Sequence, residues 1–126
     1  MICPIVDLLG IFKSPEQVNY WTNHYDWQAV VQLADFIKYA MTPKTFEKIK
    51  CPTFLGYYYE DEDHQDKVVS VAAMKEMFLQ LGTPENKKRE VDFKNAHEHV
   101  IASDLISDDW KGVETETLKF LNEIVK

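Results

Sequence analysis

The chain has 126 residues, enough for one modest domain, and 45% of them are hydrophobic, so a packed core is possible. It carries 14 Lys and Arg residues against 21 Asp and Glu residues, which gives a formal net charge of −7. That balance argues against binding to nucleic acid and against adhesion to an anionic membrane, because both need a basic surface.

The first third of the chain is predicted to be helical. Ser14-Pro15-Glu16-Gln17 is typical of a helix start, with a capping serine, a proline suited to the first turn and a glutamine that can complete a capping box. Beyond it, apolar residues recur at helical spacing and predict a helix with a core-facing stripe: Trp27, Val30, Val31, Ala34, Ile37 and Met41. Thr42-Pro43 should end this helix, since proline disfavours a helical residue before it.

After residue 45 the predicted order is strand, helix, strand, helix, over Thr53–Tyr59, Val69–Leu81, Arg89–Lys94 and Asp108–Lys126. The first strand is a continuous apolar run, as in a parallel sheet covered on both faces. Gly82 should stop the first of these helices at its C′ position. The sequence therefore predicts an α/β fold in which N-terminal helices precede a βαβα unit with parallel strands.

Two parallel strands make a poor sheet by themselves, because such strands need cover on both faces and neighbours at their edges. The first strand is also too apolar for an exposed edge. We therefore expect the chain to pair with a second copy or a partner, or to belong to a longer polypeptide.

Polar side chains follow each predicted strand. Asp66 closes the acidic loop that begins at Glu60, and His99 lies in the loop after the second strand. Because the carboxyl ends of neighbouring parallel strands meet at one edge of the sheet, these two side chains can meet. The carboxylate would then fix the tautomer of the imidazole, and the histidine would act as a general base. By composition alone, Asp66 is better explained as a cap for the helix that follows.

These residues resemble the C-terminal portion of the α/β-hydrolase superfamily. The run from Cys51-Pro52-Thr53-Phe54-Leu55-Gly56 to Asp66-Lys67-Val68-Val69 is similar to the strand-plus-acid segment of that family, with Ser70 in place of its usual proline. His99-Val100 resembles the histidine segment, and Thr117–Leu121 resembles the closing helix. The resemblance implies a helical cap-like segment over residues 1–45 and the C-terminal βαβα lobe over residues 46–126.

On this resemblance Asp66 would be the triad acid and His99 the triad base, with Asp63 and His97 as the runners-up. The order of acid and then histidine matches that of hydrolase triads, in which serine comes first. No Gly-x-Ser-x-Gly elbow occurs, so the nucleophile is absent. Ser103 is better explained as a loop or helix-capping serine, and Cys51 as a buried, inert thiol.

The resemblance implies a hydrolase of ester or amide bonds in small molecules, with the N-terminal half missing, no cofactor and no activity of this chain alone. The alternative is a non-enzymatic interaction protein that forms a homodimer or binds a partner through its exposed sheet. A third, weaker possibility is a metal-binding module built from His64, His97, His99 and the acidic loop. Two cysteines without a Cys-x-x-Cys motif favour a reduced, cytoplasmic protein, and no stretch approaches the length of a membrane span.

Overall fold

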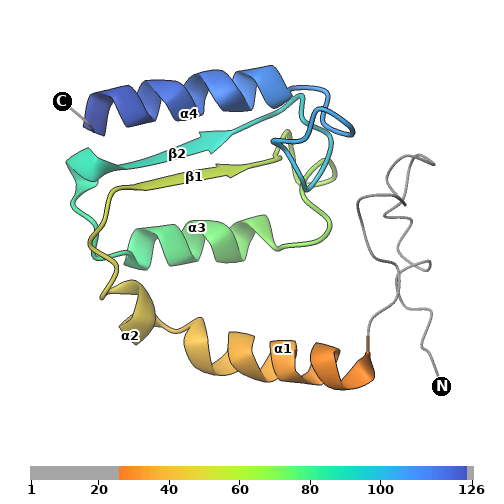
Figure 1. Ribbon diagram of the computed structural model, residues 1–126, viewed down its shortest axis with the longest axis vertical. Helices are drawn as coiled ribbons and strands as arrows, with labels where there is room; N and C mark the ends of the chain where they lie inside the picture. The colour runs from red at the N-terminus through yellow and green to blue at the C-terminus, as the bar shows by residue number, and fades with distance from the viewer. Residues whose placement is uncertain (1–25, 125–126) are drawn as a thin grey trace. The chain divides into compact units, whose positions relative to one another are not determined.

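The computed structural model describes residues 26–124, and the chain divides between Thr42 and Pro43 into two units. The first unit contains helix α1 (Trp27–Ala40). Figure 1 shows the elements of the second unit: α2 (Pro43–Phe46), β1 (Thr53–Tyr57), α3 (Val71–Gln80), a 3-10 turn (Glu85–Lys87), β2 (Lys88–Asp92) and α4 (Trp110–Ile124). The helix start predicted at Ser14–Gln17 lies outside the described residues.

Helix α1 begins and ends close to where the sequence predicts. The carboxylate of Asp26 accepts a hydrogen bond from the backbone N–H of Gln28 at 2.7 Å and so caps the first turn, and the helix stops before Thr42-Pro43. The expected burial of its apolar stripe is not found, because the described residues bury none of the α1 side chains. Trp27, for example, is 61% exposed. Helical spacing creates an apolar face, but it does not supply the surface that would cover that face.

The predicted sequence of strand, helix, strand and helix is confirmed, and the two strands are parallel. They pair in register from Thr53 opposite Lys88 to Tyr57 opposite Asp92, and α3 lies in the connection between them. Within residues 26–124 the sheet has these two strands and no others. The chain is therefore a mixed α/β protein with a small parallel sheet.

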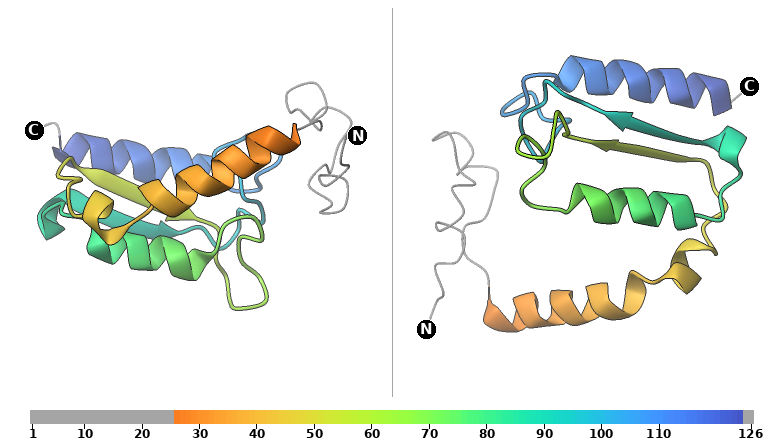
Figure 2. Two further views of the ribbon diagram at one scale, coloured as in Figure 1. Left: turned by 90° about the horizontal axis from the view of Figure 1, so that it is seen from below. Right: turned by 180° about the vertical axis from the view of Figure 1, so that it is seen from behind.

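The two faces of the sheet are covered by different helices (Figure 2). Phe54 packs at 5.6 Å between ring centroids against Phe120 of α4. The next residue along the strand, Leu55, packs against a second cluster that includes Phe78 of α3. Because successive side chains of a strand point to opposite faces, α4 covers one face and α3 the other. The expectation of a strand covered on both faces is thereby met.

Gly82 follows α3 as predicted, but a left-handed turn is not the reason that glycine is needed there. Its φ does not lie in the left-handed region, so it does not act as a left-handed helix terminator. A Cβ at this position would lie 2.1 Å from the backbone oxygen of Glu47. The backbone N–H of Gly82 donates instead to the carbonyl of Phe46 at 3.1 Å. The position thus needs glycine because two backbone segments approach closely there.

Candidate functional site

Asp66 is held at the carboxyl end of β1 by several backbone contacts. Its N–H donates to the carbonyl of Tyr58 at 3.1 Å, and its Oδ1 accepts from the N–H groups of Val68 and Val69 at 2.8 and 3.0 Å. The side chain is only 3% exposed. The helix that follows is capped by Ser70, whose Oγ accepts from the N–H of Ala73. The expectation that Asp66 caps this helix is therefore wrong, since its carboxylate closes the turn before it.

His99 meets this carboxylate from the loop after β2. Its Nδ1 lies 2.6 Å from Oδ2 of Asp66, and its side chain remains 39% exposed. Two features fix the chain just before His99. Ala96 is fully buried, and the N–H of Phe93 donates a hydrogen bond to the carbonyl of Tyr57. The contact between Asp66 and His99, which the parallel arrangement of the strands suggested, is present.

This geometry assigns different roles to the two nitrogen atoms of the imidazole. Because an ionised carboxylate only accepts hydrogen bonds, Nδ1 of His99 carries the proton that Asp66 accepts. In the neutral ring, Nε2 then holds the free lone pair. Among residues 26–124, Nε2 of His99 has no hydrogen-bond partner. This arrangement leaves Nε2 able to accept a proton from an external donor.

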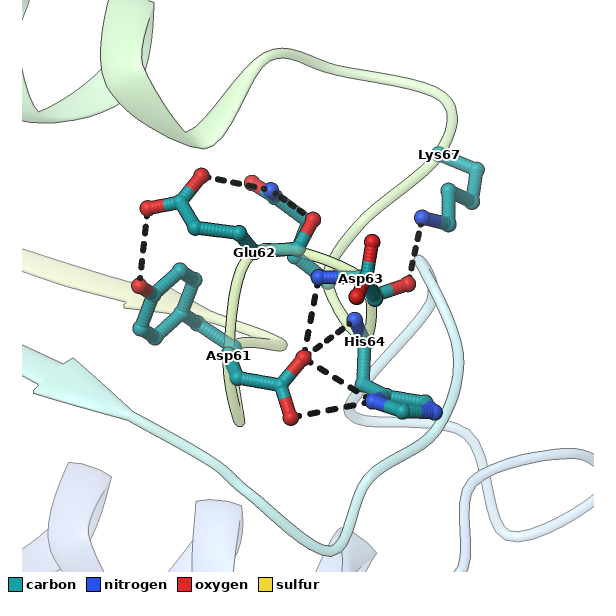
Figure 3. Close-up of polar contacts among 7 residues, drawn as sticks. Asp61, Glu62, Asp63, His64 and Lys67 are labelled. Atoms are coloured by element: carbon teal, nitrogen blue, oxygen red, sulfur yellow. Dashed lines mark hydrogen bonds and ion pairs between the residues drawn. The ribbon is translucent and has the colours of Figure 1, made fainter.

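Several polar groups of the acidic loop before Asp66 form hydrogen bonds within the loop (Figure 3). The carboxylate of Asp61 accepts from the N–H groups of Asp63 and His64 and contacts the imidazole of His64 at 2.9 Å. The hydrogen bonds from the backbone and ring of His64 lower the pKa of Asp61 below its ordinary value. Asp63, the runner-up for the acid, makes no side-chain contact with a histidine among the described residues, and Lys67 bonds only its backbone carbonyl.

His97, the runner-up for the base, forms a separate pair. Its Nδ1 lies 2.9 Å from Oδ2 of Asp108, and its ring meets that of Tyr58 edge-on at 5.7 Å between centroids. Nothing in the spacing of the sequence points to Asp108 as a partner, because an irregular loop separates the two residues.

Each of the three loop histidines considered as metal ligands contacts a different aspartate: His64 contacts Asp61, His97 contacts Asp108, and His99 contacts Asp66. In the part of the chain that the structure describes, no group of three or more histidine, cysteine, aspartate or glutamate side chains is arranged to hold a metal ion.

The described serines have local structural roles. Ser70 caps α3, Ser103 accepts from the N–H of Leu105, and Ser107, which is buried, accepts from the N–H of Asp109. The interpretation of Ser103 as a loop serine agrees with this contact. Cys51 is free and exposed, so the expectation that it is buried is wrong. It lies two residues before the start of β1, where the chain has not yet entered the covered sheet.

Comparisons of the chain with protein-family models, with curated proteins and with solved structures find no match. The function must therefore be inferred from side-chain geometry. None of the helices within residues 26–124 has both the length and the apolar composition needed to cross a membrane.

Proposed function

We propose that this chain supplies the acid and the base of a hydrolase of the α/β-hydrolase type, with Asp66 as the acid and His99 as the base. The nucleophilic hydroxyl would come from polypeptide outside residues 26–124, either in a longer protein or in a partner chain. The substrate would be a small molecule with an ester or amide bond. Residues 26–124 alone would then be catalytically silent.

The observation that carries the proposal is the contact between Nδ1 of His99 and the buried carboxylate of Asp66 at 2.6 Å. A carboxylate buried in this way is held in one orientation, because its other oxygen accepts two backbone N–H groups. It fixes the imidazole in the Nδ1–H tautomer and stabilises the imidazolium that forms when Nε2 takes a proton. A serine hydroxyl placed at Nε2 would lose its proton to this nitrogen as it attacks the carbonyl carbon of the substrate. His99 would then return that proton to the leaving group.

The placement of the pair adds support. Asp66 follows β1 and His99 follows β2, so both lie at the carboxyl ends of parallel strands, where open α/β sheets place ligands and catalytic groups. The arrangement also has the acid before the histidine along the chain, as in α/β-hydrolases. His64 and Asp61 form a second contact of similar length, but both are exposed and lie in one loop, so their contact carries less weight.

The test uses the full 126-residue chain, affinity-tagged and expressed in its source cells, and a fluorophosphonate probe added to the native lysate. We expect a labelled serine on a polypeptide that copurifies with the tagged chain, or on an endogenous form heavier than 14.8 kDa that contains this sequence. His99→Gln in the tagged chain should abolish labelling of the copurifying polypeptide. His64→Gln should preserve it, because that imidazole belongs to a separate pair.

Two results would contradict the proposal. One is an endogenous protein at 14.8 kDa that carries no label and copurifies with no labelled polypeptide. The other is equal labelling of the copurifying polypeptide with the wild-type chain and with His99→Gln.

The edges of the sheet favour a second candidate, a protein that pairs its sheet with a second copy of itself. β1 (TFLGY) has no charged residue, whereas β2 (KREVD) has four: Lys88, Arg89, Glu90 and Asp92. Charged side chains on an edge strand discourage pairing with other chains, and β1 lacks this protection. Among the described residues β1 pairs only with β2, so its other edge has no strand.

Sedimentation equilibrium over a range of dilutions tests this second candidate. We expect a monomer–dimer equilibrium, with the amide protons on the outer edge of β1 protected from hydrogen exchange in the dimer and exchanging rapidly in the monomer. A monomer at all concentrations, or a dimer that leaves these amides unprotected, would exclude pairing through β1.

A further inference from the structure

We propose that His97 and Asp108 are positioning residues for His99: together they form a latch that holds the turn from which His99 reaches Asp66. The positioning of the imidazole is an inference in its own right. Its relevance to catalysis rests on the function proposed above.

The first observation is the backbone conformation of His97. Its φ is 55°, and among the described residues it is the one non-glycine residue with a positive φ. Few residues other than glycine adopt this left-handed conformation, because the Cβ crowds the backbone, and asparagine, aspartate and histidine do so more often than the others. The conformation still costs some free energy in a histidine, and contacts within the turn can offset that cost.

Asp108 supplies two such contacts. Its backbone N–H donates to the carbonyl of Ala96 at 3.3 Å, and its Oδ2 accepts from Nδ1 of His97 at 2.9 Å. Ala96 is itself fully buried. Asp108 therefore binds both residues at the start of the turn, one through its main chain and the other through its side chain.

Tyr58 connects the latch to the acid. Its buried ring meets the ring of His97 edge-on, and its backbone carbonyl accepts from the N–H of Asp66. The turn that carries His99 and the turn that carries Asp66 thus share one anchor. Two residues after the latched His97, the chain presents His99 with Nδ1 at hydrogen-bond distance from Asp66.

Substitutions at residue 97 should change the orientation of His99 in a way that depends on the new side chain. Asparagine tolerates the left-handed conformation and has an amide that can donate to Asp108, so His97→Asn should preserve the orientation of His99. Valine is β-branched, disfavours a positive φ and has no donor, so His97→Val should lose it.

The experiment is a long-range proton–nitrogen NMR spectrum of the imidazole rings in the full-length chain. The wild-type protein should show His99 in the Nδ1–H tautomer, with a slowly exchanging Nδ1 proton. Asp108→Ala should cause loss of this proton signal and shift the ring nitrogens of His99 toward values of a free, tautomer-averaged imidazole. Asp104→Ala is the matched control, because Asp104 is an exposed aspartate of the same loop that makes no hydrogen bond or ion pair with another described residue.

If Asp108 and His97 only stabilise the fold, Asp108→Ala should melt at a lower temperature while the NMR signals of His99 stay unchanged. That result would overturn the proposal. Should Asp108→Ala fail to fold, the comparison of His97→Asn with His97→Val decides the same point, since the proposal requires the signals of His99 to persist only in the asparagine variant. This readout needs no nucleophile and no substrate. A correctly oriented His99 in a chain that never supports labelling would therefore refute the proposed function and leave the latch intact.

Discussion

Nδ1 of His99 lies 2.6 Å from Oδ2 of Asp66, although the two residues are 33 positions apart in the chain. The acid is almost fully buried and the imidazole is partly open to solvent. Nδ1 of the imidazole is thus held by the protein, while the side chain remains partly exposed to solvent. This asymmetry leads to the first of four testable predictions.

Asp66→Asn and Asp66→Ala should separate the structural role of this residue from its effect on His99. Alanine leaves the N–H groups of Val68 and Val69 without their acceptor, at a cost of about 2–3 kcal/mol in the free energy of unfolding. Asparagine can keep an oxygen toward these groups and should cost only about 1 kcal/mol, but its amide would donate to Nδ1 and impose the opposite tautomer on His99. Urea denaturation measures the stability, and imidazole NMR measures the tautomer. Equal losses for the two variants, or an unchanged tautomer in Asp66→Asn, would contradict this prediction.

Tyr57 should remain un-ionised at a pH at which exposed tyrosines have lost their proton. Burial, followed by the hydrogen bond from its hydroxyl to Glu90, raises the pKa of Tyr57 above its ordinary value of 10.0. Because the pKa is higher in the folded state than in the unfolded state, the corresponding stability is complete below about pH 10 and is lost as the pH rises further.

Ultraviolet titration of the phenol groups tests the ionisation of Tyr57, and denaturation at several alkaline pH values tests the stability. Tyr57→Phe should remove a phenol that ionises above the ordinary tyrosine range, and Tyr39→Phe, at a residue that is 74% exposed, should leave that phenol in place. The wild type and Tyr57→Phe could also give the same titration curve at pH values above the ordinary tyrosine range. That result would show that the hydroxyl of Tyr57 does not resist ionisation.

Gly82→Ala should destabilise the second unit by about 3 kcal/mol, because the new Cβ would collide with the backbone of Glu47, which cannot move away alone. Gly112→Ala is the control. There the nearest atoms belong to the side chain of Asp109, which can rotate at the cost of the hydrogen bond that it accepts from residue 112. Alanine favours the helix and offsets this loss, so the change should stay within about 1 kcal/mol. The midpoints of thermal unfolding compare the two variants, and similar midpoints would count against a close backbone approach at Gly82.

Cys51 should react with a maleimide in the folded protein. The thiol is free and exposed, and the contacts of this residue with Thr53 and Thr83 use only its backbone carbonyl. In a Cys3→Ser background, which leaves one thiol, labelling should be about as fast before as after addition of denaturant. Cys51→Ser should change the free energy of unfolding by less than about 0.5 kcal/mol. Labelling that requires denaturant would place the thiol in the interior.

Much of the second unit follows from local patterns in the sequence. The apolar period of a strand differs from that of a helix, so the order of β1, α3, β2 and α4 and their approximate bounds could be read directly. The meeting of Asp66 and His99 was also foreseeable, since neighbouring parallel strands bring their carboxyl ends together. Even here the pattern was incomplete, because Leu121 lies on the predicted apolar stripe of α4 and is 47% exposed.

The sequence by itself determined which residues form each element and at which end of the strands the acid and the histidine lie, because both depend on neighbours along the chain. Only the tertiary structure decided which partners those residues find. It brought Gly82 against the backbone of Glu47 and paired His97 with Asp108. These outcomes depend on segments that are distant in the chain and close in space, and the periodicity of a single segment carries no information about them.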